Sequence, residues 1–204
     1  MLTLLRQTGD MSKYSSDFVP AAPASLVDEN ELLRASLGEA QRRIETLEQS
    51  GGDDPVTGLP GRRRLVEELE RVTGLARRYG TTAALLTIDP KGLAAVNDDH
   101  GRFAGDRVLR HIARSVSSLI RTTDLLARFD DDRLGLILDH LDQDSAIETG
   151  ERLARCIAAV PVDLAGCTII VEAAVAVTGI MAGDGVEDVL ARAERNLAFA
   201  KSGD

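Results

Sequence analysis

Aromatic residues are scarce in this sequence: they make up 3% of its 204 residues, and tryptophan is absent. The hydrophobic share is nevertheless 44% and consists mainly of Ala, Leu, Val and Ile. A core built from such side chains is aliphatic and packs helices and sheets closely together. This composition favours an α/β domain, and the length accommodates one domain of ordinary size with an appendage.

Long hydrophobic runs and an excess of positive charge are also missing. The N-terminal MLTLLRQ is far shorter than the ~20 apolar residues that cross a bilayer, so we expect a cytoplasmic protein without a signal peptide or membrane anchor. The net charge of −9 opposes general binding to nucleic acid or to an anionic membrane. An anionic ligand therefore needs a local basic pocket.

Cysteine is rare as well. Cys156 and Cys167 lie in the apolar contexts ARCIAAV and LAGCTII, and neither has the paired spacing of a metal site or a redox motif. We expect both residues to be reduced thiols in the core.

The first 50 residues divide into two segments. Residues 1–25 mix Ser, Thr, Pro and Ala without periodicity, which predicts a flexible tail. Residues 26–50 predict a coiled-coil helix, because apolar residues recur there at alternating steps of three and four. The seam positions are Leu26, Asn30, Leu33, Leu37, Ala40, Ile44 and Leu47. We expect residues 26–49 to form a parallel homodimer; the alternative is an amphipathic helix packed on its own domain.

Helical and strand patterns alternate through residues 54–204, which we expect to form one α/β domain. Apolar periodicity predicts helices over 61–79, 103–120, 144–159 and 186–201, and strands over 82–89 and 168–180. Two short apolar runs, LLARF and LGLIL, predict a hairpin that turns at residues 130–133. Aspartate tolerates the positive backbone angles of tight turns, so we expect such angles there.

Four motifs stand in order along this region. They are DPVTGLPGRRRL, the stretch from Ile88-Asp89 through Asn97 to Gly105-Asp106, the hairpin ARFDDDRLGLIL, and ARAERNLAFAK near the C-terminus. Together they resemble the GGDEF (diguanylate cyclase) family over residues 54–201, without an obvious insertion. The resemblance implies an α/β fold with a nucleotidyl-cyclase-like central sheet flanked by helices, here preceded by the coiled-coil helix.

Members of this family condense two GTP molecules, one held by each subunit of a dimer, into cyclic di-GMP. The chemistry is metal-assisted phosphoryl transfer. It needs carboxylates that hold Mg²⁺ against the triphosphate and a backbone that phosphate groups can approach closely.

The sequence departs from the family at the hairpin. The degenerate residues there are Asp130, Asp131, Asp132, Arg133 and Leu134, in place of Gly-Gly-Asp-Glu-Phe. Aspartate adds bulk and negative charge where the family uses glycine beside an anionic nucleotide. Arg133 is a permanent cation that neither holds Mg²⁺ nor acts as a base.

Further family positions are altered to Lys91, Leu93, Ala94 and Arg102. The two metal-binding carboxylates that survive, Asp89 and Asp132, are vestigial on this interpretation. We therefore expect no catalytic residue, no metal centre, no cofactor and no enzyme activity, with Mg²⁺ bound only if GTP is bound.

Part of the family's GTP site is retained. The resemblance assigns guanine recognition to Asn97 and Asp106 and phosphate contact to Lys201, which implies a vestigial GTP-binding site. The alternative is that Asn97 and Asp106 are local caps around the start of the long helix.

The family's inhibitory site is better retained. An R-x-x-D motif before the hairpin binds cyclic di-GMP in active members, and this sequence has Arg121 and Asp124 in that place, with Arg152 at the position of a second arginine. Guanidinium groups suit phosphates and purine faces, and a carboxylate accepts from guanine N–H groups. With Arg128 they give a local basic surface. The alternative is an ion pair between Arg121 and Asp124 at a helix end.

The leading hypothesis is a catalytically inactive GGDEF protein that binds cyclic di-GMP as a homodimer and signals to an unidentified protein partner. One alternative is a dimeric interaction scaffold without a nucleotide ligand. The other is a protein with residual GTP binding or weak cyclase activity.

Overall fold

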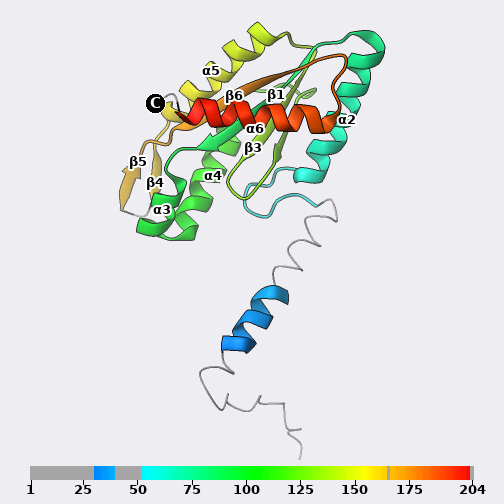
Figure 1. The fold of residues 1–204 in the computed structure, drawn as a ribbon. Helices are drawn as coiled ribbons and strands as arrows, with labels where there is room; N and C mark the ends of the chain where they lie inside the picture. Colours follow the sequence, from blue (N-terminus) through cyan, green and yellow to red (C-terminus); the bar gives the residue numbers. More distant parts are fainter. Residues whose placement is uncertain (1–29, 40–51, 165, 203–204) are drawn as a thin grey trace, which may run out of the picture. The chain divides into compact units, whose positions relative to one another are not determined.

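The computed structural model describes residues 30–39, 52–164 and 166–202, and the chain separates into two compact units, 1–44 and 45–204. In the first unit, residues 30–39 are helical, and Leu33 and Leu37 of the predicted seam are 64% and 60% exposed (Figure 1). The predicted tail and the rest of the predicted coiled coil lie outside the described residues. The dimer seam therefore stays a prediction.

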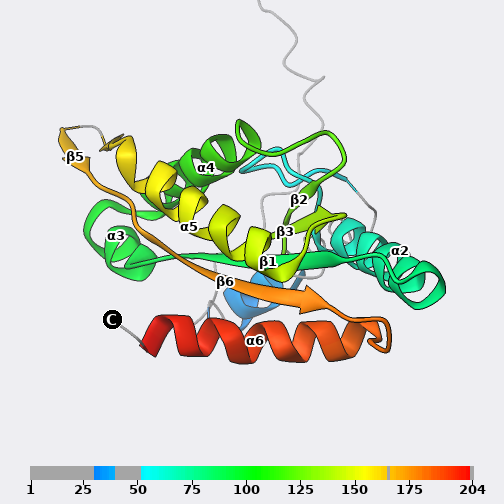
Figure 2. The same cartoon turned by 90° about the horizontal axis from the view of Figure 1, so that it is seen from above.

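The second unit contains an antiparallel sheet with strand order β2-β3-β1-β6 (Figure 2). The strands are β1 (Ala83–Pro90), β2 (Leu125–Arg128), β3 (Leu134–Asp139) and β6 (Ala173–Ile180). All residues of β1 are buried, as its apolar run predicts, because it lies between β3 and β6 with helices on both faces.

Four helices cover the two faces of this sheet (Figure 2). They are α2 (Arg62–Tyr79) and α6 (Val186–Ser202) on one face, and α4 (Arg102–Ser117) and α5 (Gln143–Ala159) on the other. Side chains alternate along β1, so that Leu85 packs with α2 and α6 whereas Leu86 packs with α4 and α5. The predicted α/β sandwich with a helix-flanked central sheet is confirmed.

Two elements differ from the prediction. The expected strand over 168–180 is two strands, since β5 (Cys167–Ile169) pairs with β4 (Val162–Leu164) in a separate sheet before β6 joins the main one. The short α3 (Leu93–His100) was not predicted, because two turns with a single buried residue carry little periodicity. Both ends of α3 are glycines with positive φ, 69° at Gly92 and 80° at Gly101.

Two smaller expectations also change. The long helix ends at Ser117 and not at 120. Cys156 and Cys167 form no disulfide, but both are half-buried at the edge of the core and not enclosed within it. None of the helices within 30–39, 52–164 and 166–202 is long and apolar enough to span a membrane.

Gly135 in β3 gives a test of this packing. A Cβ added there would lie 2.7 Å from Cδ2 of Leu65, which is fully buried, so this side chain would have to shift within the core. We expect Gly135→Ala to lower the free energy of unfolding by about 1–3 kcal/mol in urea denaturation. The control Gly74→Ala, in α2 with nothing within 4 Å of the added Cβ, should raise it by about 1 kcal/mol. Equal midpoints for Gly135→Ala and the wild type would contradict this packing.

Candidate functional site

The strand end that the sequence associates with metal binding is occupied by an internal ion pair. Asp89, near the end of β1, is 4% exposed, and Nζ of Lys201 on α6 lies 2.5 Å from its Oδ2. In the described part of the chain, no hydrogen bond reaches this buried oxygen. The vestigial metal ligand and the vestigial phosphate-contacting lysine thus neutralise each other.

Arg133 in the hairpin is held by α6. Its Nη1 donates to both carboxylate oxygens of Glu194, at 2.8 and 2.9 Å, and its guanidinium lies 3.5 Å from Asp130 and 3.6 Å from Asp132. Burial by itself lowers the pKa of Arg133, but the hydrogen bonds that it donates to Glu194, together with the nearby carboxylates, outweigh this effect and the pKa is raised. A fixed cation therefore occupies the position of the family's glutamate.

Arg128 joins the same hairpin to the segment that precedes α2. Its Nη1 donates to Oδ2 of Asp54 at 2.6 Å, and its other nitrogens donate to the backbone carbonyls of Asp130 and Asp131. Burial raises the pKa of Asp54, but hydrogen bonds from Thr57 and Arg128 outweigh it and lower the pKa. Arg128 is 18% exposed and committed to these contacts, so the expectation that it joins a basic surface is wrong.

The backbone of the turn also differs from the prediction. It is closed by the N–H groups of Phe129 and Asp130, which donate to the carbonyl of Arg133 at 2.9 and 3.3 Å. The only non-glycine residue with a positive φ in the described ranges is His140, outside this turn. Side-chain bonds from Arg128, and not left-handed aspartates, stabilise the turn.

The residues present do not fit a magnesium centre. In the part of the chain with defined positions, no three His, Cys, Asp or Glu side chains converge as a metal-binding group. Asp89 is paired with Lys201, and Asp132 lies beside Arg133. Hard divalent cations require several free oxygen ligands, and protein cations already occupy these carboxylates.

Asn97 and Asp106 come together through the packing of α3 on α4. The side-chain amide of Asn97 lies against Gly105, the residue before Asp106. A Cβ added to Gly105 would overlap Oδ1 of Asn97, so this contact requires glycine. The alternative reading of both residues as side-chain caps is wrong, because the N-cap of α4 is Gly101 and no side chain caps it. Both residues are half-buried, and their assignment to guanine recognition stays a prediction.

Arg121 and Asp124 form a turn between α4 and β2. Oδ2 of Asp124 accepts from the backbone N–H of Arg121 at 2.8 Å, and the N–H of Asp124 donates to the carbonyl of Arg121 at 3.1 Å. The alternative ion pair is absent: among the residues described, the exposed guanidinium of Arg121 pairs with no carboxylate. The carboxylate is fixed, and the arginine side chain stays available.

Arg152 lies on the exposed side of α5 and lines a small cavity of about 300 Å³ with Glu148, Thr149, Glu151 and Arg155. Helices α4 and α5 run antiparallel, and Nε2 of His111 on α4 lies 3.1 Å from the carbonyl oxygen of Ile157 (Figure 2). Arg152 precedes Ile157 by five residues, which is about 7.5 Å along the axis of α5. Because the two helices are antiparallel, this displacement is toward the C-terminal end of α4, after which Arg121 follows. No hydrogen bond or ion pair joins it to Arg121 or Asp124 within the ranges described.

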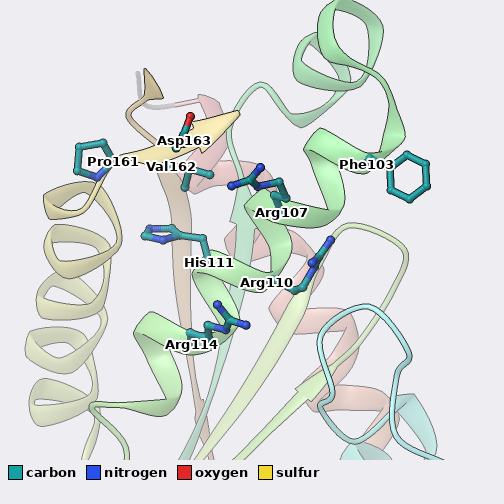
Figure 3. Close-up of a pocket in the computed structure, with 8 residues that line it drawn as sticks. All are labelled: Phe103, Arg107, Arg110, His111, Arg114, Pro161, Val162 and Asp163. Atoms are coloured by element: carbon teal, nitrogen blue, oxygen red, sulfur yellow. The ribbon is translucent and has the colours of Figure 1, made fainter. Parts of the chain in front are cut away.

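One surface was missed by the sequence analysis. A groove of about 490 Å³ runs along α4 and is bordered by Arg107, Arg110 and Arg114 (Figure 3). The signal was present, because arginines at steps of three and four share one face of a helix. None of these three arginines belongs to the motifs that resemble the family, so the resemblance does not point to them.

Comparison with known protein families matches residues 52–204 to the family described as "Diguanylate cyclase, GGDEF domain". The diguanylate cyclase DgcP of Pseudomonas aeruginosa is 32% identical over 158 residues, which cover 78% of this chain and 24% of DgcP. The chain thus spans about a quarter of that relative's length.

Two solved structures show the same fold. The diguanylate cyclase SiaD, in complex with its activator SiaC from Pseudomonas aeruginosa, matches with a TM-score of 0.71 and 31% identity over 87% of this chain and 70% of that chain. The coiled coil and GGDEF domain of DgcB from Caulobacter crescentus, in complex with c-di-GMP, matches with a TM-score of 0.71 and 23% identity. That second match covers 85% of this chain and 94% of the other.

Proposed function

Since the chain belongs to the GGDEF domain family of diguanylate cyclases, we propose that it binds cyclic di-GMP without synthesising it. In this proposal the ligand is held by Arg121 and Asp124, with Arg152 supplied by the same or a neighbouring subunit. The protein acts as a homodimer that passes the signal to a protein partner. The observation that carries the proposal is the contrast between the hairpin, where cations and carboxylates pair internally, and Arg121, whose guanidinium is available.

The hairpin argues against synthesis on two grounds. Arg133 is engaged by Glu194 and offers neither an oxygen ligand for a metal nor a base. The exposed carboxylate of Asp131 stands where the family places a glycine. A carboxylate ~4 Å from a phosphate costs on the order of 4 kcal/mol at an effective dielectric of ~20.

The Arg121 turn argues for binding. The backbone N–H of Arg121 donates to Oδ2 of Asp124 at 2.8 Å and so orients this carboxylate, whose other oxygen can accept from the N–H groups of a guanine. Within the described ranges the guanidinium of Arg121 has no ion-pair partner that it would lose on binding a phosphate. Each charge-assisted hydrogen bond contributes roughly 1.5–3 kcal/mol. The solved structure of SiaD contains an activator protein, and that of DgcB contains c-di-GMP. Both agree with a signalling role for this chain.

Calorimetric titration with cyclic di-GMP tests the proposal. We expect saturable binding by the wild type and at least tenfold weaker binding by Arg121→Ala, a loss of about 1.4 kcal/mol. Asp132→Ala, in the hairpin, should leave the affinity nearly unchanged. Arg77→Ala is the control, because Arg77 on α2 is, like Arg121, an exposed arginine of the same domain.

Two results would count against the receptor. One is the absence of both heat and thermal shift with excess cyclic di-GMP, after which the dimeric scaffold becomes the better account. The other is equal weakening by Arg77→Ala and Arg121→Ala, which would indicate attraction to net charge and not a site.

A further inference from the structure

The groove along α4 has one basic wall and one mixed wall (Figure 3). Arg107, Arg110 and Arg114 follow one another at steps of three and four along the helix, with Phe103 one turn before them. The opposite wall is the segment 161–163, which ends in Asp163. The volume of about 490 Å³ is within the range of small-molecule sites.

These three arginines are among those of the domain that pair with no carboxylate in the described ranges. The arginines that form ion pairs with carboxylates are Arg63, Arg64, Arg71, Arg128, Arg133, Arg155 and Arg192. Arg107, Arg110 and Arg114 form none with any residue of the described ranges; Arg110 donates only to the backbone carbonyl of Asp106, at 3.1 Å. Like charges at these spacings destabilise a helix by a few tenths of a kcal/mol per pair. Although the chain has a net charge of −9, no carboxylate of residues 30–39, 52–164 or 166–202 forms an ion pair that would offset this repulsion.

The remaining lining residues favour a small ligand with a planar group. Phe103 is 84% exposed at one end of the stripe, and an aromatic face of this kind stacks on a purine or pyrimidine. His111 is held in the floor of the groove by its contact with the carbonyl of Ile157 at 3.1 Å. Asp163, the acidic residue of the lining, offers an acceptor for a sugar hydroxyl or a base amine on the wall opposite the arginines.

We propose that this groove binds a nucleotide that carries several phosphate groups, with the phosphates on Arg107, Arg110 and Arg114 and the base on Phe103. Guanidinium forks bind phosphate oxygens in pairs, and three of them over two helical turns match a chain of phosphates better than a single anion. The groove contains none of the residues assigned above to GTP or to cyclic di-GMP. It is therefore a separate site, and it stands whether or not the receptor proposal holds.

The test uses two probes, sodium tripolyphosphate and ATP without Mg²⁺, titrated into the full chain by calorimetry. We expect both to bind. The double substitution Arg107→Gln with Arg110→Gln should weaken both at least tenfold, whereas Arg77→Gln on α2 should change neither by more than twofold. Phe103→Ala should weaken the binding of ATP at least threefold and leave the binding of tripolyphosphate unchanged, because only ATP has a base that can stack on Phe103.

Thermal unfolding of each variant separates loss of binding from loss of fold. Arg77, Phe103 and Arg107 are exposed and Arg110 is half-buried, so we expect melting temperatures without ligand close to that of the wild type. Three results would overturn the proposal. They are no binding of tripolyphosphate at millimolar concentration, equal losses for Arg77→Gln and the groove variant, and abolition of binding by Arg121→Ala, which would place the anion at the other site.

Discussion

Incubation of the purified protein with GTP and Mg²⁺ is expected to give no cyclic di-GMP above a reaction without protein. The family's glutamate position holds Arg133, which two hydrogen bonds of 2.8 and 2.9 Å tie to Glu194. Asp89, the carboxylate at the strand end, is paired with Lys201. General acid–base groups contribute about 10²–10⁴-fold to rate by themselves, and loss of the metal ligands adds to that deficit. Chromatographic detection of product, with an active GGDEF domain assayed in parallel, measures this.

Repair of the hairpin alone should not restore full activity. Gly-Gly-Asp-Glu-Phe at residues 130–134 includes Arg133→Glu, which sets a new carboxylate against Glu194 and removes the ion pair that holds the turn to α6. Lys91, Leu93 and Ala94 also stay in place. Product made by the wild type and abolished by Asp132→Ala would refute the inactive assignment. Full activity of the repaired hairpin would show that the altered residues 91–94 are harmless.

The substitutions Leu37→Asp and Ile44→Asp together are expected to convert a dimer into a monomer. Both residues belong to the predicted seam, and carboxylates buried opposite each other in a two-stranded coiled coil lose their hydration without gaining a partner. Leu37 is 60% exposed in the single chain, as a seam residue without its partner should be. Multi-angle light scattering measures the mass directly.

A charge-matched variant controls this experiment. Ala35→Asp with Arg42→Ala changes the net charge by the same two units but at positions on the outer side of the predicted heptad. It should leave the dimer intact. If the seam variant keeps the wild-type mass, residues 26–49 are not the dimer contact and the helix packs elsewhere.

Local patterns in the sequence predicted most of the fold. The helices α2, α5 and α6 and the strands β1, β2 and β3 lie within a residue or two of their predicted bounds. Their apolar periods are long and regular, and each is bounded by a turn signal. The predicted elements are wrong where the apolar pattern is very short or where one apolar run continues from one strand into the next. The two-turn helix α3 has only one buried residue, so it has little periodicity. The apolar run over 168–180 is continuous, although it contains two strands, β5 and β6, that belong to different sheets.

For the candidate sites, too, the sequence predicted the residue types but not the contacts that the side chains make. Residue types alone indicated that the hairpin lacks glycine and that Arg133 cannot act as a glutamate. They did not reveal that Arg121 bonds to Asp124 through its backbone and leaves its guanidinium available. Nor did they show that Arg128 is turned inward, or that three arginines of α4 line a groove.

The sequence by itself determined the family and the order of the elements, and it predicts the loss of the catalytic residue types, because these depend on neighbours a few positions apart. Only the tertiary structure decided which charges are available. Arg133 meets Glu194, Arg128 meets Asp54 and Lys201 meets Asp89 across 61, 74 and 112 positions (201 − 89) of the chain. Such pairs form only when the helices and strands that carry them pack together, so no local pattern distinguishes a paired arginine from one that is available to a ligand.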